Sequence, residues 1–203
     1  MKKLLLTSAV IISAGAAQAA VTPYVSLKAG YMDNAAEAFI PGMPVDVSQK
    51  IYGFGGFVGS VAGGLGFEVD PLVTLRGELE YSYARTTLTV IGETLALNAN
   101  SIMANGYADF GAASWAVKPY VGFGLGYSFG SASNLLGIGT DIDGEGGFAY
   151  AYMIGAAWYI NSHFALDASV KRWVNNGGIT VGGTTIDTKY TGTSYMVGAR
   201  YSF

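Results

Sequence analysis

The sequence has no cysteine, a single histidine, few charges and no apolar run long enough to cross a membrane as a helix. Without cysteine, the chain forms neither disulfides nor thiolate metal sites. A membrane-spanning helix needs about 20 consecutive apolar residues. The apolar run at residues 4–12 is shorter, and later apolar stretches are broken by charges or by several glycines. These absences exclude a disulfide-stapled domain, a cysteine-based metal centre and a helical membrane anchor after the leader.

The first 19 residues have the pattern of a secretory signal peptide. Lys2 and Lys3 precede an apolar segment, which is followed by the small-x-small sequence Ala17-Gln18-Ala19. We expect cleavage after Ala19, with Ala20 as the near alternative. The exported chain would then have no disulfide to stabilise it, so its stability must come from another source.

Residues 20–203 are expected to form one domain, and their composition is unusually apolar for an exported soluble domain. The whole chain is 51% hydrophobic and 12% charged, with a mean hydropathy of +0.35. The apolar residues are scattered, as in a β-barrel in lipid, where half of each strand faces hydrocarbon. Of 11 basic and 14 acidic residues, removal of two leader lysines leaves 9 basic, a net charge of −5. This acidic balance disfavours nucleic acid as a partner.

Eight segments alternate apolar residues with small or polar ones, which is the two-residue period of a β-strand. The clearest segment places Leu75, Leu79 and Tyr81 opposite Arg76 and Glu80. The expected strands cover about 23–31, 54–69, 72–86, 99–110, 118–130, 147–160, 164–174 and a last strand ending in 195–203. The longer connections are expected at about 32–50, 89–97, 131–146 and 175–189. We also expect a bulge near Gly55-Gly56, where the apolar phase changes.

Long and short connections alternate along the chain, which is the pattern of transmembrane barrels with short periplasmic turns and longer surface loops. The even number of strands puts both ends of the domain in the periplasm. The sequence therefore predicts an all-β fold, an eight-stranded antiparallel up-and-down transmembrane β-barrel with four extracellular loops. Its outward aromatic residues would form two interfacial girdles. They are Tyr31, Tyr81, Tyr127, Trp158, Tyr201 and Phe203.

Three stretches resemble the eight-stranded outer-membrane barrels of the opacity-protein and OmpA/OmpX type. They are Pro119-Tyr120-Val121-Gly122 followed by Gly124 and Gly126, the alternating run 75–81, and the aromatic ending at 195–203. The resemblance implies a cell outer-membrane location, with outer-membrane lipids and lipopolysaccharide as partners. It also implies that Tyr201 and Phe203 serve as the signal read by the barrel assembly machinery. No OmpA-like periplasmic domain is expected, because no residue follows Phe203.

The inward face of the expected barrel carries charges at mid-strand. They are Lys28, Glu68, Arg76, Glu78, Glu80, Asp109, Asp167, Lys171 and Arg200. An eight-stranded barrel has an interior just wide enough for side chains to fill, and an unpaired buried charge is very costly. We therefore expect a network of ion pairs that fills the lumen, including a contact between Arg76 and one of Glu68, Glu78 or Glu80. An ion path is the alternative, and the glycines at 122, 124 and 126 are its main support. An acid–base pair is disfavoured because no substrate-sized space is expected beside these carboxylates.

An acidic cluster and the single histidine are two further candidate sites. Asp141, Asp143 and Glu145 are a weak metal candidate, since a calcium loop needs more spaced oxygen ligands than these. A diffuse acidic loop that shares divalent cations with lipopolysaccharide is the better interpretation. His163 falls in an expected periplasmic turn, away from the outer leaflet, so histidine chemistry on lipid A is disfavoured. No cofactor and no catalytic residue are expected.

The sequence thus favours a surface protein, mainly structural or adhesin-like, whose loops contact host or envelope molecules. The first alternative is a narrow porin-like channel for small solutes or ions. The second is a lipid-A-modifying enzyme, against which the position of the single histidine argues. Nothing in the loop sequences indicates which ligand they bind.

Overall fold

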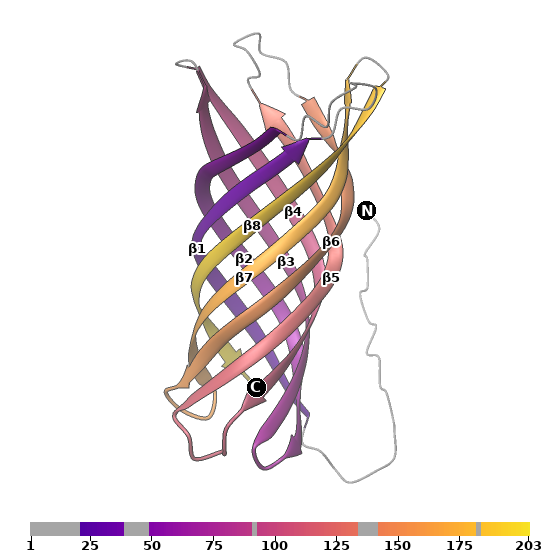
Figure 1. Ribbon diagram of the computed structural model, residues 1–203. Helices are drawn as coiled ribbons and strands as arrows, with labels where there is room; N and C mark the ends of the chain where they lie inside the picture. The colour runs from indigo at the N-terminus through magenta and orange to yellow at the C-terminus, as the bar shows by residue number, and fades with distance from the viewer. Residues whose placement is uncertain (1–20, 39–48, 91–92, 134–141, 182–183) are drawn as a thin grey trace, which may run out of the picture.

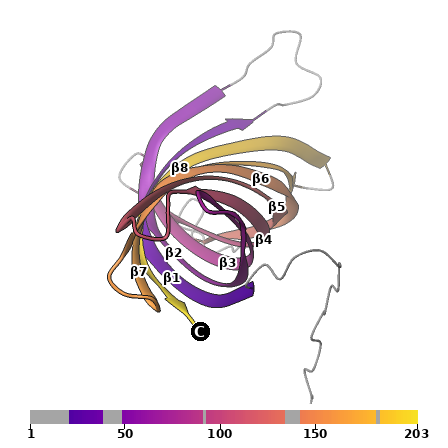
Figure 2. The same cartoon turned by 90° about the horizontal axis from the view of Figure 1, so that it is seen from below.

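The computed structural model is a closed barrel of eight antiparallel strands, each paired with the next along the chain and the last with the first (Figure 1). Figure 2 shows the strands forming a ring when the barrel is viewed along its axis. The strands are β1 (Val21–Ala38), β2 (Gln49–Asp70), β3 (Val73–Val90), β4 (Glu93–Phe110), β5 (Val117–Ser133), β6 (Ile142–Tyr159), β7 (Phe164–Val181) and β8 (Thr184–Ser202). The structure describes residues 21–38, 49–90, 93–133, 142–181 and 184–203, so the expected signal peptide lies outside it.

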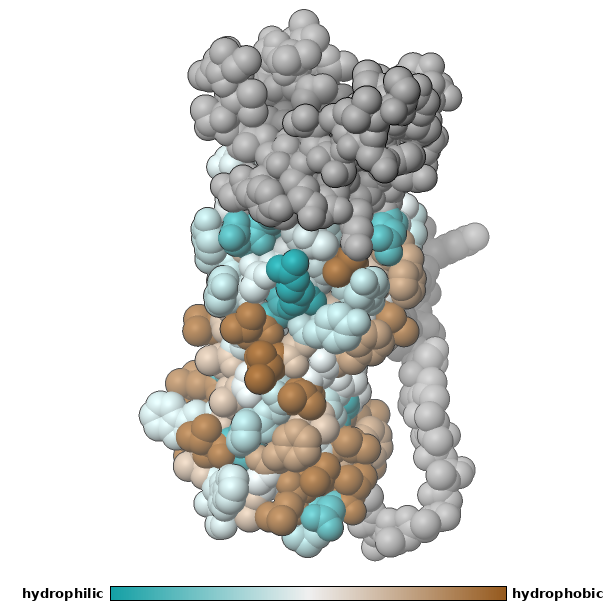
Figure 3. Space-filling view, in the orientation of Figure 1, coloured by the Kyte–Doolittle hydropathy of each residue, from teal (hydrophilic) through white to brown (hydrophobic). Residues whose placement is uncertain are grey.

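Alternation along each strand separates a buried inner face from an apolar outer face. Leu27, Leu79 and Val197 point outward and are 67%, 63% and 68% exposed. Such a surface would be unfavourable in water but matches the hydrocarbon band of a transmembrane barrel. In Figure 3, apolar side chains gather on the lower and middle part of the visible wall, and polar ones lie nearer its upper edge. In the described part of the chain, no helix is long and apolar enough to cross a membrane.

The strands extend further than the sequence predicted at their outer ends. Strand β1 reaches Ala38 instead of residue 31, and β7 reaches Val181 instead of residue 174. Much of each expected loop is therefore strand. The apolar alternation marks only the part of a strand that contacts lipid, whereas the hydrogen-bond ladder continues through polar pairs such as Arg85 opposite Asn98.

The expected bulge is present near its predicted position. In the β1–β2 pair, Asn34 lies opposite Phe54 and Ala35 opposite Tyr52, so the register skips Gly53. The prediction of a bulge in this part of β2 is confirmed within two or three residues. The extra residue at Gly53 explains the change of phase at Tyr52, whereas Phe54 lies downstream of the bulge and keeps the register of Val58.

The opposite end of the barrel has short connections, and the chain ends there (Figure 1). The turn after β2 is held by the backbone N–H of Leu72, which donates to Asp70 Oδ1 at 2.9 Å. In the turn before β7, Asn161 Oδ1 accepts from the backbone N–H of Phe164 at 2.8 Å. At closure, the backbone N–H of Phe203 donates to the Pro23 carbonyl oxygen at 3.0 Å. These hydrogen bonds hold the turns and the chain end in place at this end of the barrel.

Candidate functional site

The pairing register brings polar side chains from distant strands into one layer inside the barrel. Arg76 on β3 lies opposite Tyr107 on β4, which lies opposite Gly122 on β5. All three are inward positions, because alternate residues of a strand face the same side. We call the resulting cluster the lumen plug. It consists of Tyr24, Lys28, Arg76, Glu78, Glu80, Asn105, Tyr107, Asp109, Tyr120, Asp167, Lys171 and Arg200.

Arg76 is at the centre of the lumen plug. Its Nε and Nη2 donate to the two oxygens of Asp109 at 2.7 and 2.9 Å, a bidentate pair that is strong and directional. The guanidinium carbon also lies 4.3 Å from the Tyr107 ring centroid and 5.1 Å from that of Tyr120. Those two rings meet edge to face, with centroids 5.5 Å apart. The arginine is thus held between a carboxylate and two aromatic rings.

A second arginine extends the network across the barrel. Arg200 Nη2 donates to Asp167 at 2.9 Å, and its Nη1 lies 3.5 Å from Asp109. Asp167 also accepts from the Tyr120 hydroxyl at 2.6 Å, and Lys28 Nζ lies 4.0 Å from it. Cations and carboxylates therefore alternate from one wall of the lumen to the other.

The two glutamates of the plug are satisfied in different ways. Glu80 forms an ion pair with Lys171 and accepts from the Ser82 hydroxyl at 2.8 Å. Glu78 accepts from the hydroxyls of Tyr107 at 2.6 Å and Tyr24 at 3.0 Å, and from Asn105 Nδ2 at 3.3 Å. Among the described residues, no cation lies within ion-pair distance of Glu78.

The plug contains equal numbers of each charge. The cations are Lys28, Arg76, Lys171 and Arg200, and the carboxylates are Glu78, Glu80, Asp109 and Asp167. All eight residues are between 1% and 7% exposed. A neutral set can be buried at this density, whereas one unmatched charge would carry a desolvation penalty of several kcal/mol.

Three glycines of β5 pack closely against β4 beside the plug. A Cβ at Gly122 would overlap the Tyr107 ring, and one at Gly124 would overlap Asn105 Oδ1. At Gly126 it would overlap the backbone carbonyl of Ile102. The space that these residues give up is therefore taken by their neighbours on β4.

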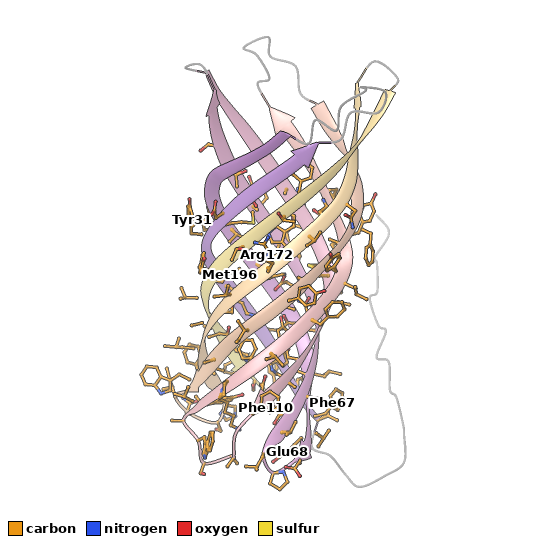
Figure 4. All side chains as sticks on the ribbon, viewed as in Figure 1. Tyr31, Phe67, Glu68, Phe110, Arg172 and Met196 are labelled. Atoms are coloured by element: carbon orange, nitrogen blue, oxygen red, sulfur yellow. The ribbon has the colours of Figure 1, made fainter. Side chains whose placement is uncertain are left out.

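Glu68 does not join the network, and its expected contact with Arg76 is wrong. Glu68 is exposed, lies at the short-turn end of the barrel (Figure 4), and has no ion pair with any described residue. Arg76 instead forms its ion pair with Asp109, which is 1% exposed. Glu68 and Asp109 are both opposite Thr74, one on each neighbouring strand. A desolvated arginine gains more from a carboxylate that is also desolvated than from one that stays in water.

Sequence reasoning missed the part played by Tyr120 in the plug. Tyr120 is 1% exposed and bonds Asp167, yet in the sequence it served only as part of a motif. Its position two residues before Gly122 places it on the inward face of β5, so the alternation alone could have found it. The direction in which its hydroxyl points could not be read from the sequence.

The candidate metal site lies partly outside the residues that the structure describes. Asp141 is outside the described residues. Asp143 and Glu145 fall within β6, where their backbones pair with Ser131 and Gly178 instead of forming a loop. Within the described ranges, no three acidic, histidine or cysteine residues gather closely enough to hold a metal.

His163 lies exposed in the turn between β6 and β7, at the short-turn end of the barrel. Its Nδ1 is 2.9 Å from the Ser162 hydroxyl, and its ring stacks on Tyr201 with centroids 6.1 Å apart. Tyr201 and Phe203 are outward residues, 45% and 69% exposed. Their reading by the assembly machinery stays a prediction.

The outward aromatic residues also occupy two levels. Tyr31 lies in the upper half of the wall, and Phe67 and Phe110 lie near its lower end (Figure 4).

The family model described as the outer membrane protein beta-barrel domain matches residues 3–203. The chain belongs to this family. Its place is therefore the outer membrane.

Solved structures of outer-membrane barrels have the same fold. Neisserial surface protein A matches with a TM-score of 0.60 at 19% identity, over 89% of this chain and 97% of that one. AlkL matches with a TM-score of 0.51 at 16% identity, over 100% and 97%. OprG from Pseudomonas aeruginosa matches with a TM-score of 0.50 at 14% identity, over 90% and 96%. No curated protein matches the chain.

Proposed function

We propose that this outer-membrane barrel is a non-conducting surface protein whose outer strand ends and connections contact a host or envelope ligand. The lumen plug is the observation that carries the proposal. Four buried cations and four buried carboxylates span the interior, tied to one another and to three tyrosine hydroxyls. A barrel closed in this way has its outer surface, not its lumen, available for function.

The outer end supports the same conclusion. All eight strands continue past the apolar band, and the connections at 39–48 and 134–141 are the longest that join them. Scaffolds of this kind hold variable binding segments on a rigid frame. The name of Neisserial surface protein A describes a similar barrel as a surface protein, which agrees with this use of the fold.

The test is to replace residues 39–48 and 134–141 with short Gly-Ser linkers and compare the variant with the parent chain. Both proteins should form heat-modifiable barrels in the outer membrane, because the plug and the strand pairing are unchanged. Intact cells that carry the variant should attach less to immobilised host glycoproteins than cells that carry the parent chain. Alternatively, the purified variant should attach less to isolated envelope than the purified parent. Equal attachment by parent and variant, with barrels correctly formed in both, would contradict the proposal.

A further inference from the structure

The lumen above the plug is different in character from the plug itself. It contains a cavity of about 40 Å³ whose lining comes from all eight strands. The wall is largely apolar, with Met32, Val58, Ala84 and Met196 forming a packed cluster against Trp173. Lys171, already paired with Glu80, closes its lower side. Because the plug seals the barrel below, this cavity is a blind pocket.

One row of residues across β1, β8 and β7 adjoins the cavity: Trp173 belongs to its lining, and Asn34 is the next inward residue of β1 after the lining residue Met32. Asn34 is opposite Gly192, and Gly192 is opposite Trp173. A Cβ at Gly192 would lie no more than 2.5 Å from both Asn34 Oδ1 and Trp173 Nε1. These two polar atoms are therefore at most about 5 Å apart, on either side of a place where the chain has no side chain.

Neither polar atom has a good partner. Asn34 is 8% exposed, and its Oδ1 accepts no hydrogen bond from the described residues. Trp173 Nε1 donates to Met32 Sδ at 2.9 Å, and a thioether sulfur is a weak acceptor. A buried acceptor left without a donor costs about 1–3 kcal/mol, so a ligand that supplied one would be stabilised.

We propose that this cavity binds a small uncharged molecule with one hydroxyl group and an alkyl part of three or four carbons. Its hydroxyl donates to Asn34 Oδ1 and accepts from Trp173 Nε1, since one oxygen can bridge atoms about 5 Å apart through two hydrogen bonds of roughly 2.8 Å. The alkyl part packs on Met32 and Met196. A volume of 40 Å³ corresponds to about three water-sized positions, which limits the ligand to this length. An ion is disfavoured because the plug is already neutral and the wall apolar.

The test uses the indole N–H signal of Trp173, recorded by NMR on the full chain in detergent micelles and assigned by its loss in Trp173→Phe. Titration with 1-butanol should shift this signal to saturation. Diethyl ether, an isomer of 1-butanol, accepts from Trp173 but cannot donate to Asn34, so its apparent affinity should be roughly tenfold weaker. In Asn34→Leu, which keeps a side chain of similar size, the two probes should bind equally.

Two glycine variants provide the matched controls. Gly192→Ala places a methyl group between Asn34 and Trp173 and should abolish the saturable shift. Gly77→Ala adds the same methyl group on the lipid face, where nothing lies within 4 Å, and should leave binding unchanged. A linear drift without saturation, or equal affinity for the two probes in the parent chain, would overturn the inference.

The inference rests on the closed lumen of the proposed function, and the two can fail separately. Conductance of the same preparation in planar bilayers reports the lumen independently of the NMR signal. A silent barrel without saturable butanol binding would contradict the pocket alone. A conducting barrel that still discriminates butanol from ether would contradict the closed lumen alone.

Discussion

Arg76 shows how one inward residue organises the lumen. It contacts a carboxylate on the neighbouring strand, the Tyr24 hydroxyl on β1 at 3.2 Å, and two tyrosine rings. Its position was predictable, because alternation along β3 assigns Arg76 to the inner face. Its partner was not predictable, because Glu68 and Asp109 both lie opposite Thr74 in the strand pairing. The two carboxylates differ only in their depth in the lumen.

Replacing Arg76 with alanine should strongly destabilise the barrel. The change leaves Asp109 with only Arg200 at 3.5 Å and makes the buried set negative by one charge. We expect a loss of about 3–5 kcal/mol in the free energy of unfolding, measured by urea titration in lipid vesicles.

Arg85→Ala is the control, since Arg85 lies on the same strand but is exposed on the outer face. This substitution should change the free energy of unfolding by no more than about 0.5 kcal/mol. An equally small loss for Arg76→Ala would mean that water reaches the plug and screens its charges.

At the scale of the strand, alternation was the reliable signal and strand length was not. The inward and outward rows of β3 are those predicted from the sequence, because lipid and lumen demand opposite side chains. The outer ends were missed because polar residues there satisfy the ladder without an apolar face. Residues such as Asn34 on β1, beyond the predicted end of that strand, are buried there, although no apolar pattern marks them.

Strand β5 offers a test of the close fit between strands. Gly122→Ala puts a methyl group into the Tyr107 ring, which is fixed by its hydrogen bond to Glu78 and by Arg76. We expect a loss of about 1–3 kcal/mol in the free energy of unfolding, as for other overpacked sites.

The control for Gly122→Ala is Gly63→Ala. Gly63 is on the outer face of β2, and nothing lies within 4 Å of the added methyl group. The stability of this variant should match that of the parent. If Gly122→Ala were equally harmless, the inner face of β5 would have spare room, and the filled lumen would be contradicted.

The last strand is expected to carry the assembly signal. Tyr201 on β8 and Phe203 just after it are exposed and contact each other edge to face, with centroids 5.3 Å apart. Phe203→Ser should lower the amount of heat-modifiable barrel in the outer membrane and increase periplasmic degradation, because the aromatic signal is lost.

Phe110→Ser provides the comparison for Phe203→Ser. Phe110 is another exposed aromatic residue, on β4 at the end of the barrel where the chain also ends (Figure 4). Its loss removes similar apolar area without touching the end of the chain. Equal yields from these two variants would show that Phe203 acts only as part of the girdle.

At the scale of the whole molecule, the barrel combines an apolar wall, a neutral ionic centre and polar outer strand ends. The fold class was readable from the sequence because eight alternating segments with alternating connections allow few other arrangements. The exclusion of Glu68 from the centre was not readable, because the depth of a residue in the lumen depends on the stagger between strands. That stagger also fixes the balance of four cations against four carboxylates.

Single-channel recording in planar bilayers tests the closed lumen most directly. Purified barrel should give no steady conductance, because Arg76, Arg200 and their carboxylates fill the cross-section and are balanced in charge. The double variant Lys171→Ala with Glu80→Ala removes one ion pair while preserving neutrality, and it shows whether opening the plug makes current detectable. Stable steps from the parent chain that disappear when Gly124 is replaced by phenylalanine would contradict the account and make the barrel a narrow channel.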